Sequence, residues 1–163
     1  DVRMYEMTEK ILEEYGYHKY EISNYSKPGY ECRHNLGYWS RISYLGVGLN
    51  AASYLEEKRF QQTESMKEYL DQKNFLRYFE EARPLSWEEQ VEEFMFLGLR
   101  RTAGVKETEF EECFGRSMES VYGPVIEKAE KGGWIKRNPD QIALTQQGIL
   151  FSNQVLSEFL LSE

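Results

Sequence analysis

The first 55 residues alternate between a helical pattern and short segments that favour strands. Near the start, apolar side chains recur every three to four positions, which predicts a helix that Gly16 ends. Residues 18–22 are rich in β-forming side chains, and residues 23–29 are typical of a turn. Residues 44–49 (YLGVGL) are apolar on both faces, which predicts a strand inside a sheet. This order is typical of the closing units of a parallel α/β sheet or barrel. The apolar positions of the first helix are Met4, Met7, Ile11, Leu12 and Tyr15.

A second unit is predicted from Pro84 onward, after a polar stretch at residues 61–83 that predicts a connecting helix or linker. Ser86 and Glu89 match the capping-box pattern at the start of a helix. The apolar spacing that follows predicts that this helix faces a core. Its core-facing positions are Val91, Phe94, Met95 and Leu99.

The rest of this unit is predicted to contain three further helices and a hairpin. Phe110 and Phe114 mark a short helix, and a longer one is expected over residues 118–129, where Pro124 predicts a late start or a bend. Turn residues at 138–141 predict a β-hairpin, and Thr145 is placed to cap one last helix. Three helices, a hairpin and a helix make a winged-helix-like unit.

The charge of the chain argues against nucleic acid as a partner. The 163 residues have a formal net charge of −8, and residues 84–163 hold 8 basic against 14 acidic side chains. The third helix of the winged-helix-like unit carries Glu119, Glu127 and Glu130 against Lys128 and Lys131. Base recognition and phosphate contact require the opposite balance. We therefore expect a structural or lid role, with a nucleic-acid-binding module as an alternative.

Composition favours a folded protein with a packed core, no membrane span and reduced cysteines. Hydrophobic residues make up 40% and aromatic residues 15% of the chain, which favours a packed core over disorder. No apolar run approaches the ~20 residues of a membrane span. The two cysteines, at positions 32 and 113, are typical of reduced thiols in a cytoplasmic protein. The chain begins with Asp1 inside a helical pattern, so we expect it to be a fragment of a longer protein.

A polar cluster lies between the two predicted strand ends. The stretch CRHN at residues 32–35 is followed by Tyr38 and Trp39. Chemistry in α/β folds lies past the carboxyl ends of strands. We therefore expect residues 21–25, 34–39 and 50–53 to converge on one open edge.

Several simpler interpretations of this cluster stay open. Taken alone, His34 is more often a hydrogen-bonded structural histidine than a ligand, and Cys32 is most often an inert buried thiol. Nucleophilic catalysis by Cys32 and His34 lacks an identifiable third group, and the sequence has no CxxC or HxxxH pattern for zinc. Gly46 and Gly48 lie inside a predicted strand rather than before a helix. They are therefore expected to allow close approach of a ligand or a neighbouring backbone.

Four longer stretches together resemble a known family. They are YEISNYSKPGYECRHNLGYW, YLGVGLNAASY, FMFLGLRRTAGV and LTQQGILFSNQVLSEFL. In this order they closely resemble the oxygen-independent coproporphyrinogen III oxidase-like family of radical SAM proteins (HemN/HemW). The resemblance covers almost the whole chain and corresponds to the C-terminal part of those proteins. HNLGYW fits the HNxxYW pattern of the HemW-type heme chaperones better than that of the true oxidases.

The resemblance implies an α/β fold, or α+β for a fragment. Residues 1–60 would be the C-terminal end of a partial TIM-like barrel, residues 61–83 a connecting helix or linker, and residues 84–163 a HemN-type winged-helix-like domain. It also implies S-adenosylmethionine and a 4Fe-4S cluster held by CxxxCxxC. That motif needs three cysteines and this chain has two, so the cluster ligands are expected upstream of Asp1. We therefore expect no catalytic residue and no ligand of the cluster in this chain.

The resemblance also implies specific contact residues. Asn50, Ala51 and Ala52 would lie at the edge of the S-adenosylmethionine site. His34 would be an axial ligand of heme or a related tetrapyrrole, with Asn35, Tyr38 and Trp39 beside the macrocycle. Partners would be heme and heme-acceptor proteins in the cytoplasm, with no nucleic acid and no membrane span. Heme chaperone, porphyrinogen oxidase and plain protein-interaction module all remain open at this point.

Overall fold

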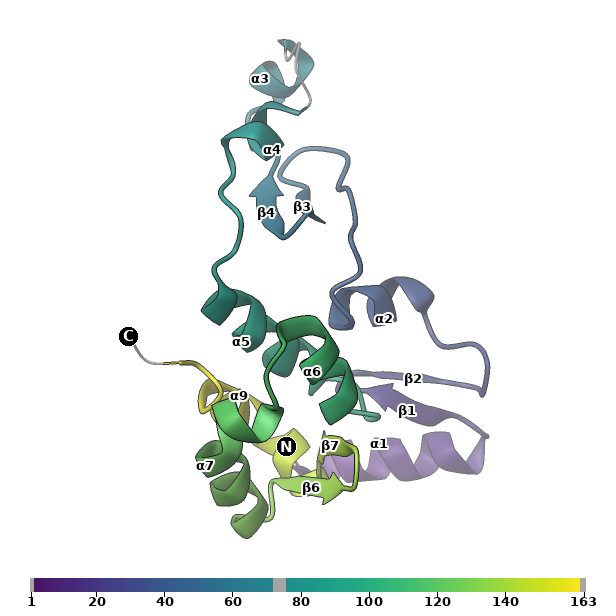
Figure 1. Ribbon diagram of the computed structural model, residues 1–163. Helices are drawn as coiled ribbons and strands as arrows, with labels where there is room; N and C mark the ends of the chain where they lie inside the picture. Colours follow the sequence, from purple (N-terminus) through teal and green to yellow (C-terminus); the bar gives the residue numbers. More distant parts are fainter. Residues whose placement is uncertain (1, 72–75, 162–163) are drawn as a thin grey trace.

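The computed structural model describes residues 2–71 and 76–161 (Figure 1). In its first part, helix α1 is followed by the hairpin β1–β2, helix α2, the hairpin β3–β4 and two short helices. Both hairpins are antiparallel, with register pairs His18–Ser26 and Tyr54–Arg59 among others. The bounds are α1 Val2–Glu14, β1 His18–Glu21, β2 Asn24–Ser26, α2 Arg33–Trp39, β3 Ala52–Leu55, β4 Lys58–Gln61, α3 Met66–Asp71 and α4 Arg77–Glu81.

The predicted first helix and the strand that follows it are both present. Gly16 lies just after this helix with a positive φ of +78°, as is typical of a residue that ends a helix. The turn expected at residues 23–29 instead contains β2, which pairs back onto β1. Residues 52–61, which had no predicted hairpin, form β3–β4 around Glu56 and Glu57. Both of these residues have positive φ, 49° and 55°, as the primed turns of two-residue hairpin loops require.

The interior strand predicted at residues 44–49 is wrong. Apart from one bridge between Tyr44 and Tyr54, this segment is a loop, and Leu45, Val47 and Leu49 are 59%, 82% and 37% exposed. A strand that is apolar on both faces needs strands beside it and layers above and below it. No described part of the chain covers residues 45–49 in this way, so their apolar side chains meet solvent.

The polar cluster that follows Cys32 is helical. Arg33–Trp39 is the helix α2, with Cys32 at its N-cap and no side-chain capping bond. Helical spacing therefore replaces the alternation of an extended chain, and residues four apart share one face. This change decides which side chains of the polar cluster meet.

The second part of the chain is the predicted winged-helix-like unit. Its three-stranded antiparallel sheet has the order β5-β7-β6, with helices packed around it (Figure 1). The capping box at Ser86 and Glu89 is present, and Thr145 caps a helix as predicted. The bounds are α5 Trp87–Gly98, β5 Val105–Lys106, α6 Glu107–Phe114, α7 Met118–Lys131, β6 Ile135–Asn138, β7 Gln141–Leu144, α8 Gln146–Leu150 and α9 Ser152–Ser157.

Two details of this unit differ from the prediction. Helix α7 begins at Met118, well before Pro124, because Ser117 caps it and Met118 and Tyr122 are buried in the core. The last helix is divided into α8 and α9 at Phe151. Helix α8 packs Gly148 closely on the backbone just before β6, where an added Cβ would lie 1.9 Å from the Trp134 carbonyl oxygen.

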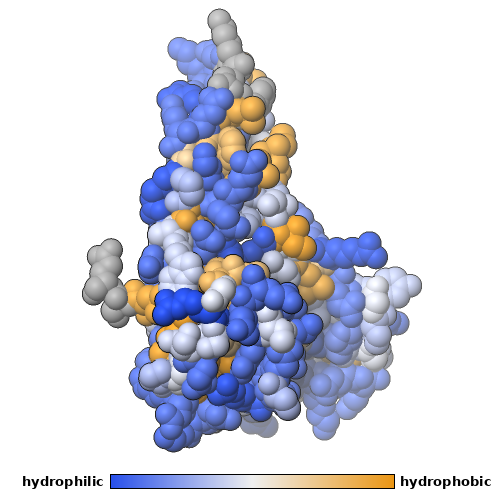
Figure 2. All heavy atoms as spheres, viewed as in Figure 1, coloured by the Kyte–Doolittle hydropathy of each residue, from blue (hydrophilic) through white to orange (hydrophobic). Residues whose placement is uncertain are grey.

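The hydrophobic core lies in residues 91–159 and joins α5, α6, α7, α9 and the sheet. By contrast, α1 has no buried residue. On the face drawn in Figure 2, hydrophilic residues cover most of the lower part, and hydrophobic residues are concentrated along the right side of the upper part. Among the described residues, no helix combines the length and apolar character that a membrane crossing requires.

Candidate functional site

Helix α2 arranges the aromatic residues of the polar cluster. His34 and Tyr38 are four positions apart and meet edge to face, with ring centroids 4.4 Å apart. Tyr38 meets Tyr44, from the following loop, at the same distance and at an interplanar angle of 78°. The three rings thus form a continuous row from the exposed surface of α2 to the loop before β3.

This row of rings lies between two hollows. The smaller, about 170 Å³, is lined by His34 together with Gly37 and Ile42. The larger, about 450 Å³, is lined by Trp39, Ala51 and Ala52. Tyr38 and Tyr44 line both hollows. The candidate heme ligand and the candidate S-adenosylmethionine edge therefore lie on opposite sides of one aromatic wall.

The predicted convergence of three segments is only partly confirmed. Residues of 34–39 and 50–53 line the larger hollow, but none of residues 21–25 lines either one. Asn35 and Asn50 also lie outside the lining of both. The backbone oxygen of Asn50 accepts a hydrogen bond from Gln61 Nε2 at 3.1 Å, so this residue supports β4. Glu21 and Ile22 instead pair with the segment after α5, where the Ile22 N–H donates to the Arg100 carbonyl oxygen at 2.9 Å, and Asn24 and Tyr25 pair with β1.

The imidazole of His34 is exposed and has no hydrogen-bond partner within the described part of the chain. Within the described residues, His34 is therefore not held by a hydrogen bond as a structural histidine would be. Its ring packs against Tyr38. Cys32 is exposed as well, which corrects the prediction of an inert buried thiol.

The glycine at position 46 makes room for a backbone, as one of the two predicted explanations states. A Cβ at Gly46 would lie 2.2 Å from the Ala52 carbonyl oxygen, and the Gly46 N–H donates to Ser53 Oγ at 3.0 Å. This contact fixes the loop against β3 and so positions Ala51 and Ala52 in the wall of the larger hollow.

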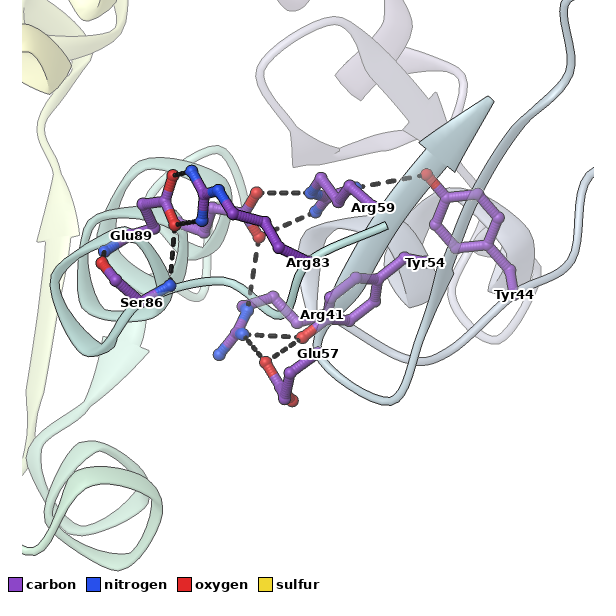
Figure 3. Close-up of polar contacts among 9 residues, drawn as sticks. Arg41, Tyr44, Tyr54, Glu57, Arg59, Arg83, Ser86 and Glu89 are labelled. Carbon is purple, nitrogen blue, oxygen red and sulfur yellow. Dashed lines mark hydrogen bonds and ion pairs between the residues drawn. The ribbon is translucent and has the colours of Figure 1, made fainter. Parts of the chain in front are cut away.

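A polar network behind the hollow joins the hairpin β3–β4 to helix α5 (Figure 3). Arg59 forms a paired contact with Glu93 and lies 3.4 Å from the Tyr44 hydroxyl. Arg41 pairs with Glu57 and donates to the Tyr54 hydroxyl at 2.6 Å. Burial, and then the hydrogen bond to Glu57, raise the pKa of Tyr54, so its phenol stays protonated and donates to that carboxylate.

These network residues were not predicted from the sequence. Arg59 and Glu93 are 34 positions apart, and no local pattern connects them. The network matters for the site because Tyr44 belongs both to it and to the aromatic wall. Helix α5, in the winged-helix-like unit, is thus mechanically linked to the ring of Tyr38.

A metal centre is not formed by the described residues. Within residues 2–71 and 76–161, no three His, Cys, Asp or Glu side chains lie close enough together to hold a metal ion.

Comparison with known proteins identifies the family. The HemN C-terminal domain family matches residues 85–151. The heme chaperone HemW of Bacillus subtilis (strain 168) is 39% identical over 163 residues, covering 98% of this chain and 42% of that protein. The chain belongs to the HemN/HemW family. HemW of Lactococcus lactis is 36% identical and HemW of Escherichia coli (strain K12) 30% identical, with 98% and 96% of this chain covered.

The fold agrees with this HemN/HemW assignment. Coproporphyrinogen III oxidase (HemN) from Escherichia coli, a radical SAM enzyme, matches 95% of this chain and 39% of its own length, with a TM-score of 0.69 at 14% identity. The predicted family resemblance and mixed α/β fold class are confirmed. The chain spans 42% of the length of the HemW relatives named here, and the exact domain boundaries stay a prediction.

Proposed function

We propose that this chain is the part of a HemW-type heme chaperone that contributes a tetrapyrrole contact through helix α2. The observation that supports this most is the exposed, unpartnered imidazole of His34 in a chain 30–39% identical to the HemW chaperones named above. A neutral imidazole is a common axial ligand of heme iron. The adjacent ring of Tyr38 offers an apolar edge to a flat macrocycle.

The two hollows suggest separate tasks for the predicted contact residues. His34 and Tyr38 face the smaller one, where a macrocycle would project outward into solvent. Trp39, Ala51 and Ala52 line the larger one, which suits an edge contact with S-adenosylmethionine in the intact protein. Asn35, next to His34 in the sequence, would act at the rim of the tetrapyrrole site, and Asn50 would hold the turn before Ala51.

In this proposal the chain supplies no catalytic residue and no ligand of a 4Fe-4S cluster. S-adenosylmethionine and the cluster would be held by other parts of the intact protein. Heme-acceptor proteins as partners and a cytoplasmic location stay predictions. Nucleic acid is an unsuitable partner because the chain is acidic and three of the four basic side chains on α7 and β6 are already in ion pairs. These pairs are Lys128–Glu158, Lys131–Glu127 and Arg137 with Glu107 and Glu119.

The test is a heme titration of the intact protein followed by its absorption spectrum. His34→Ala is expected to weaken binding and to shift the Soret band, because the axial nitrogen is lost while contact with the rings remains. His18→Ala is the matched control, since the chain has two histidines and His18 is paired with Glu31 at 3.0 Å.

The control variant should keep the wild-type spectrum and affinity. If His34→Ala leaves the Soret band unchanged while heme still binds, His34 is not the ligand. If neither variant nor wild type binds heme, the chaperone proposal fails for this protein.

A further inference from the structure

The smaller hollow beside His34 has one permanently charged side chain in its described lining, that of Arg33. Arg33 is the first residue of α2 and directly precedes His34 in the sequence. The other described residues of the lining include no carboxylate. A positive charge without a balancing acid therefore lies next to the candidate heme ligand, in a chain whose net charge is −8.

The Arg33 guanidinium is available to a ligand. Its side chain is exposed and takes part in no ion pair, hydrogen bond or ring contact with residues 2–71 and 76–161. The acid nearest to it in the sequence, Glu31, is engaged elsewhere. The Glu31 carboxylate contacts His18 Nε2 at 3.0 Å and accepts a hydrogen bond from the Gly29 N–H at 3.2 Å. The N–H donors of the guanidinium therefore remain free within the part of the chain that the structure describes.

The apolar part of the same lining is held in place by the backbone. The Ile42 N–H donates to the Gly37 carbonyl oxygen at 2.9 Å, which fixes Ile42 against α2. A Cβ added at Gly37 would lie 3.9 Å from the Ile42 Cβ, so the Ile42 side chain lies directly over this point of the helix. Ile42 is nevertheless 62% exposed. Together with the Tyr38 ring, it gives the hollow an accessible apolar surface in addition to the cation.

We propose that Arg33 binds a carboxylate group of the tetrapyrrole whose iron His34 would ligate. This inference rests on the proposed function and adds to it a residue that determines specificity. Heme is a flat apolar ring that carries propionate carboxylates along one edge. A guanidinium matches a carboxylate through two parallel hydrogen bonds, and the apolar surface suits the ring beside it. The hollow would therefore select tetrapyrroles whose acidic side chains are free.

The size of the hollow limits how much of such a ligand it encloses. Its volume is about 170 Å³. Pockets that enclose a whole ligand usually measure about 300–1,000 Å³. Only part of a macrocycle can enter here, so apolar burial alone does not determine how the ring is turned. An ion pair with Arg33 would determine which edge turns toward α2, because complementary charge contributes specificity more than affinity.

The experiment titrates the intact protein with heme, with heme whose propionates are methyl esters, and with metal-free protoporphyrin. The wild type should bind heme about 5-fold more tightly than the ester at low ionic strength, which is the upper range for an exposed ion pair. Added salt should reduce this ratio. Arg33→Gln should abolish the preference, because it should weaken the binding of heme and leave the binding of the ester unchanged.

The variants separate the carboxylate contact from the iron contact. Arg33→Gln should leave the Soret band of bound heme in place and should weaken the binding of metal-free protoporphyrin as much as that of heme. His34→Ala should do the reverse, with a shifted Soret band and unchanged binding of the metal-free ligand. Arg33→Lys keeps the charge but loses the two-pronged geometry, so it should recover part of the preference for heme over the ester.

Arg116→Gln is the matched control, because Arg116 is exposed, lies against Trp87 and does not line the hollow. It should keep the wild-type preference for heme over the ester. Arg33→Gln should unfold at the same temperature as the wild type, since the Arg33 side chain makes no polar or ring contact within the described residues.

The outcomes distinguish this inference from the proposed function. Equal affinity of the wild type for heme and its ester would overturn the role of Arg33, as would a preference that Arg33→Gln retains. In both cases a Soret band that depends on His34 would still support the proposed function. If the wild type binds none of the ligands, the inference and the proposed function both fail.

Discussion

Residues 84–161 and residues 2–83 are held together by different kinds of contact. In the first, aromatic rings from three helices meet at close distances, such as Phe110 with Phe114 at 4.9 Å and Tyr122 with Phe159 at 5.3 Å. In the second, the large apolar side chains that are buried among the described residues are Tyr20, Tyr54 and Phe60. Apolar burial is the larger and less directional source of stability. The winged-helix-like unit is therefore the more self-contained of the two.

The first region depends instead on polar contacts that reach across to the second. Arg59 and Arg41 both meet Glu93 on α5, and β1 pairs with the segment after α5. Meanwhile α1 leaves Met4, Met7 and Ile11 between 49% and 65% exposed. Ion pairs and hydrogen bonds position these elements without covering their apolar faces. The comparison shows how a chain maintains a defined site on a region that has little core of its own.

Removing a ring from the core should produce the largest effect. Phe110→Ala deletes a fully buried side chain that contacts Phe94, Phe114 and Tyr122, and should lower the free energy of unfolding by about 3–5 kcal/mol. Denaturant unfolding followed by circular dichroism measures this loss. Phe151→Ala, at a position that is 50% exposed, is the control and should cost far less. Similar losses for both would contradict the assignment of the core to this unit.

Breaking the polar link should loosen the first region selectively. Glu93→Gln removes the carboxylate shared by Arg59 and Arg41, at a cost of about 2 kcal/mol, as for a hydrogen bond to a charged group. Amide hydrogen exchange should increase in β3 and β4 but not in β6 and β7. Glu81→Gln breaks an exposed pair with Arg77 and should change neither hairpin. Uniform exchange across both units would mean that Glu93 stabilises the core itself.

The smallest effect is expected at the junction of the two regions. The Arg83 guanidinium, and then the Ser86 N–H, lower the pKa of Glu89 to about 2 (Figure 3). Because this pKa lies below the ordinary value of 4.5, the contribution to stability is fully present above about pH 4.5. It is then lost as the pH falls toward about 2. Unfolding midpoints measured across this range should therefore converge for wild type and Glu89→Gln at the acid end.

The matched control for this pH profile is Glu88→Gln. Glu88 is exposed on the same turn of α5 and forms no ion pair within the described residues. Its curve should run parallel to that of wild type. A Glu89→Gln curve that also stays parallel down to pH 2 would show that the Arg83 contact adds nothing in solution.

Much of the winged-helix-like unit was predictable because its signals are local. Ser86 with Glu89, Thr145 and the turn at residues 138–141 each determine a helix start or a hairpin through hydrogen bonds between neighbours in the chain. The site was predictable only as a motif. HNLGYW indicated the candidate side chains, but no helix was predicted where α2 forms, so the contact of His34 with Tyr38 was not foreseen.

The sequence by itself determined the family, the order of most elements and the acidic character from which we predict that nucleic acid is not a partner, because these depend on residue identity and short spacing. Only the tertiary structure decided that residues 44–49 form an exposed loop, since burial depends on what covers a segment. It also decided which arginines have carboxylate partners. Arg59 meets Glu93 across 34 positions while Arg100 and Arg101 meet none among the described residues, because ion pairing depends on distance in space, which sequence separation does not determine.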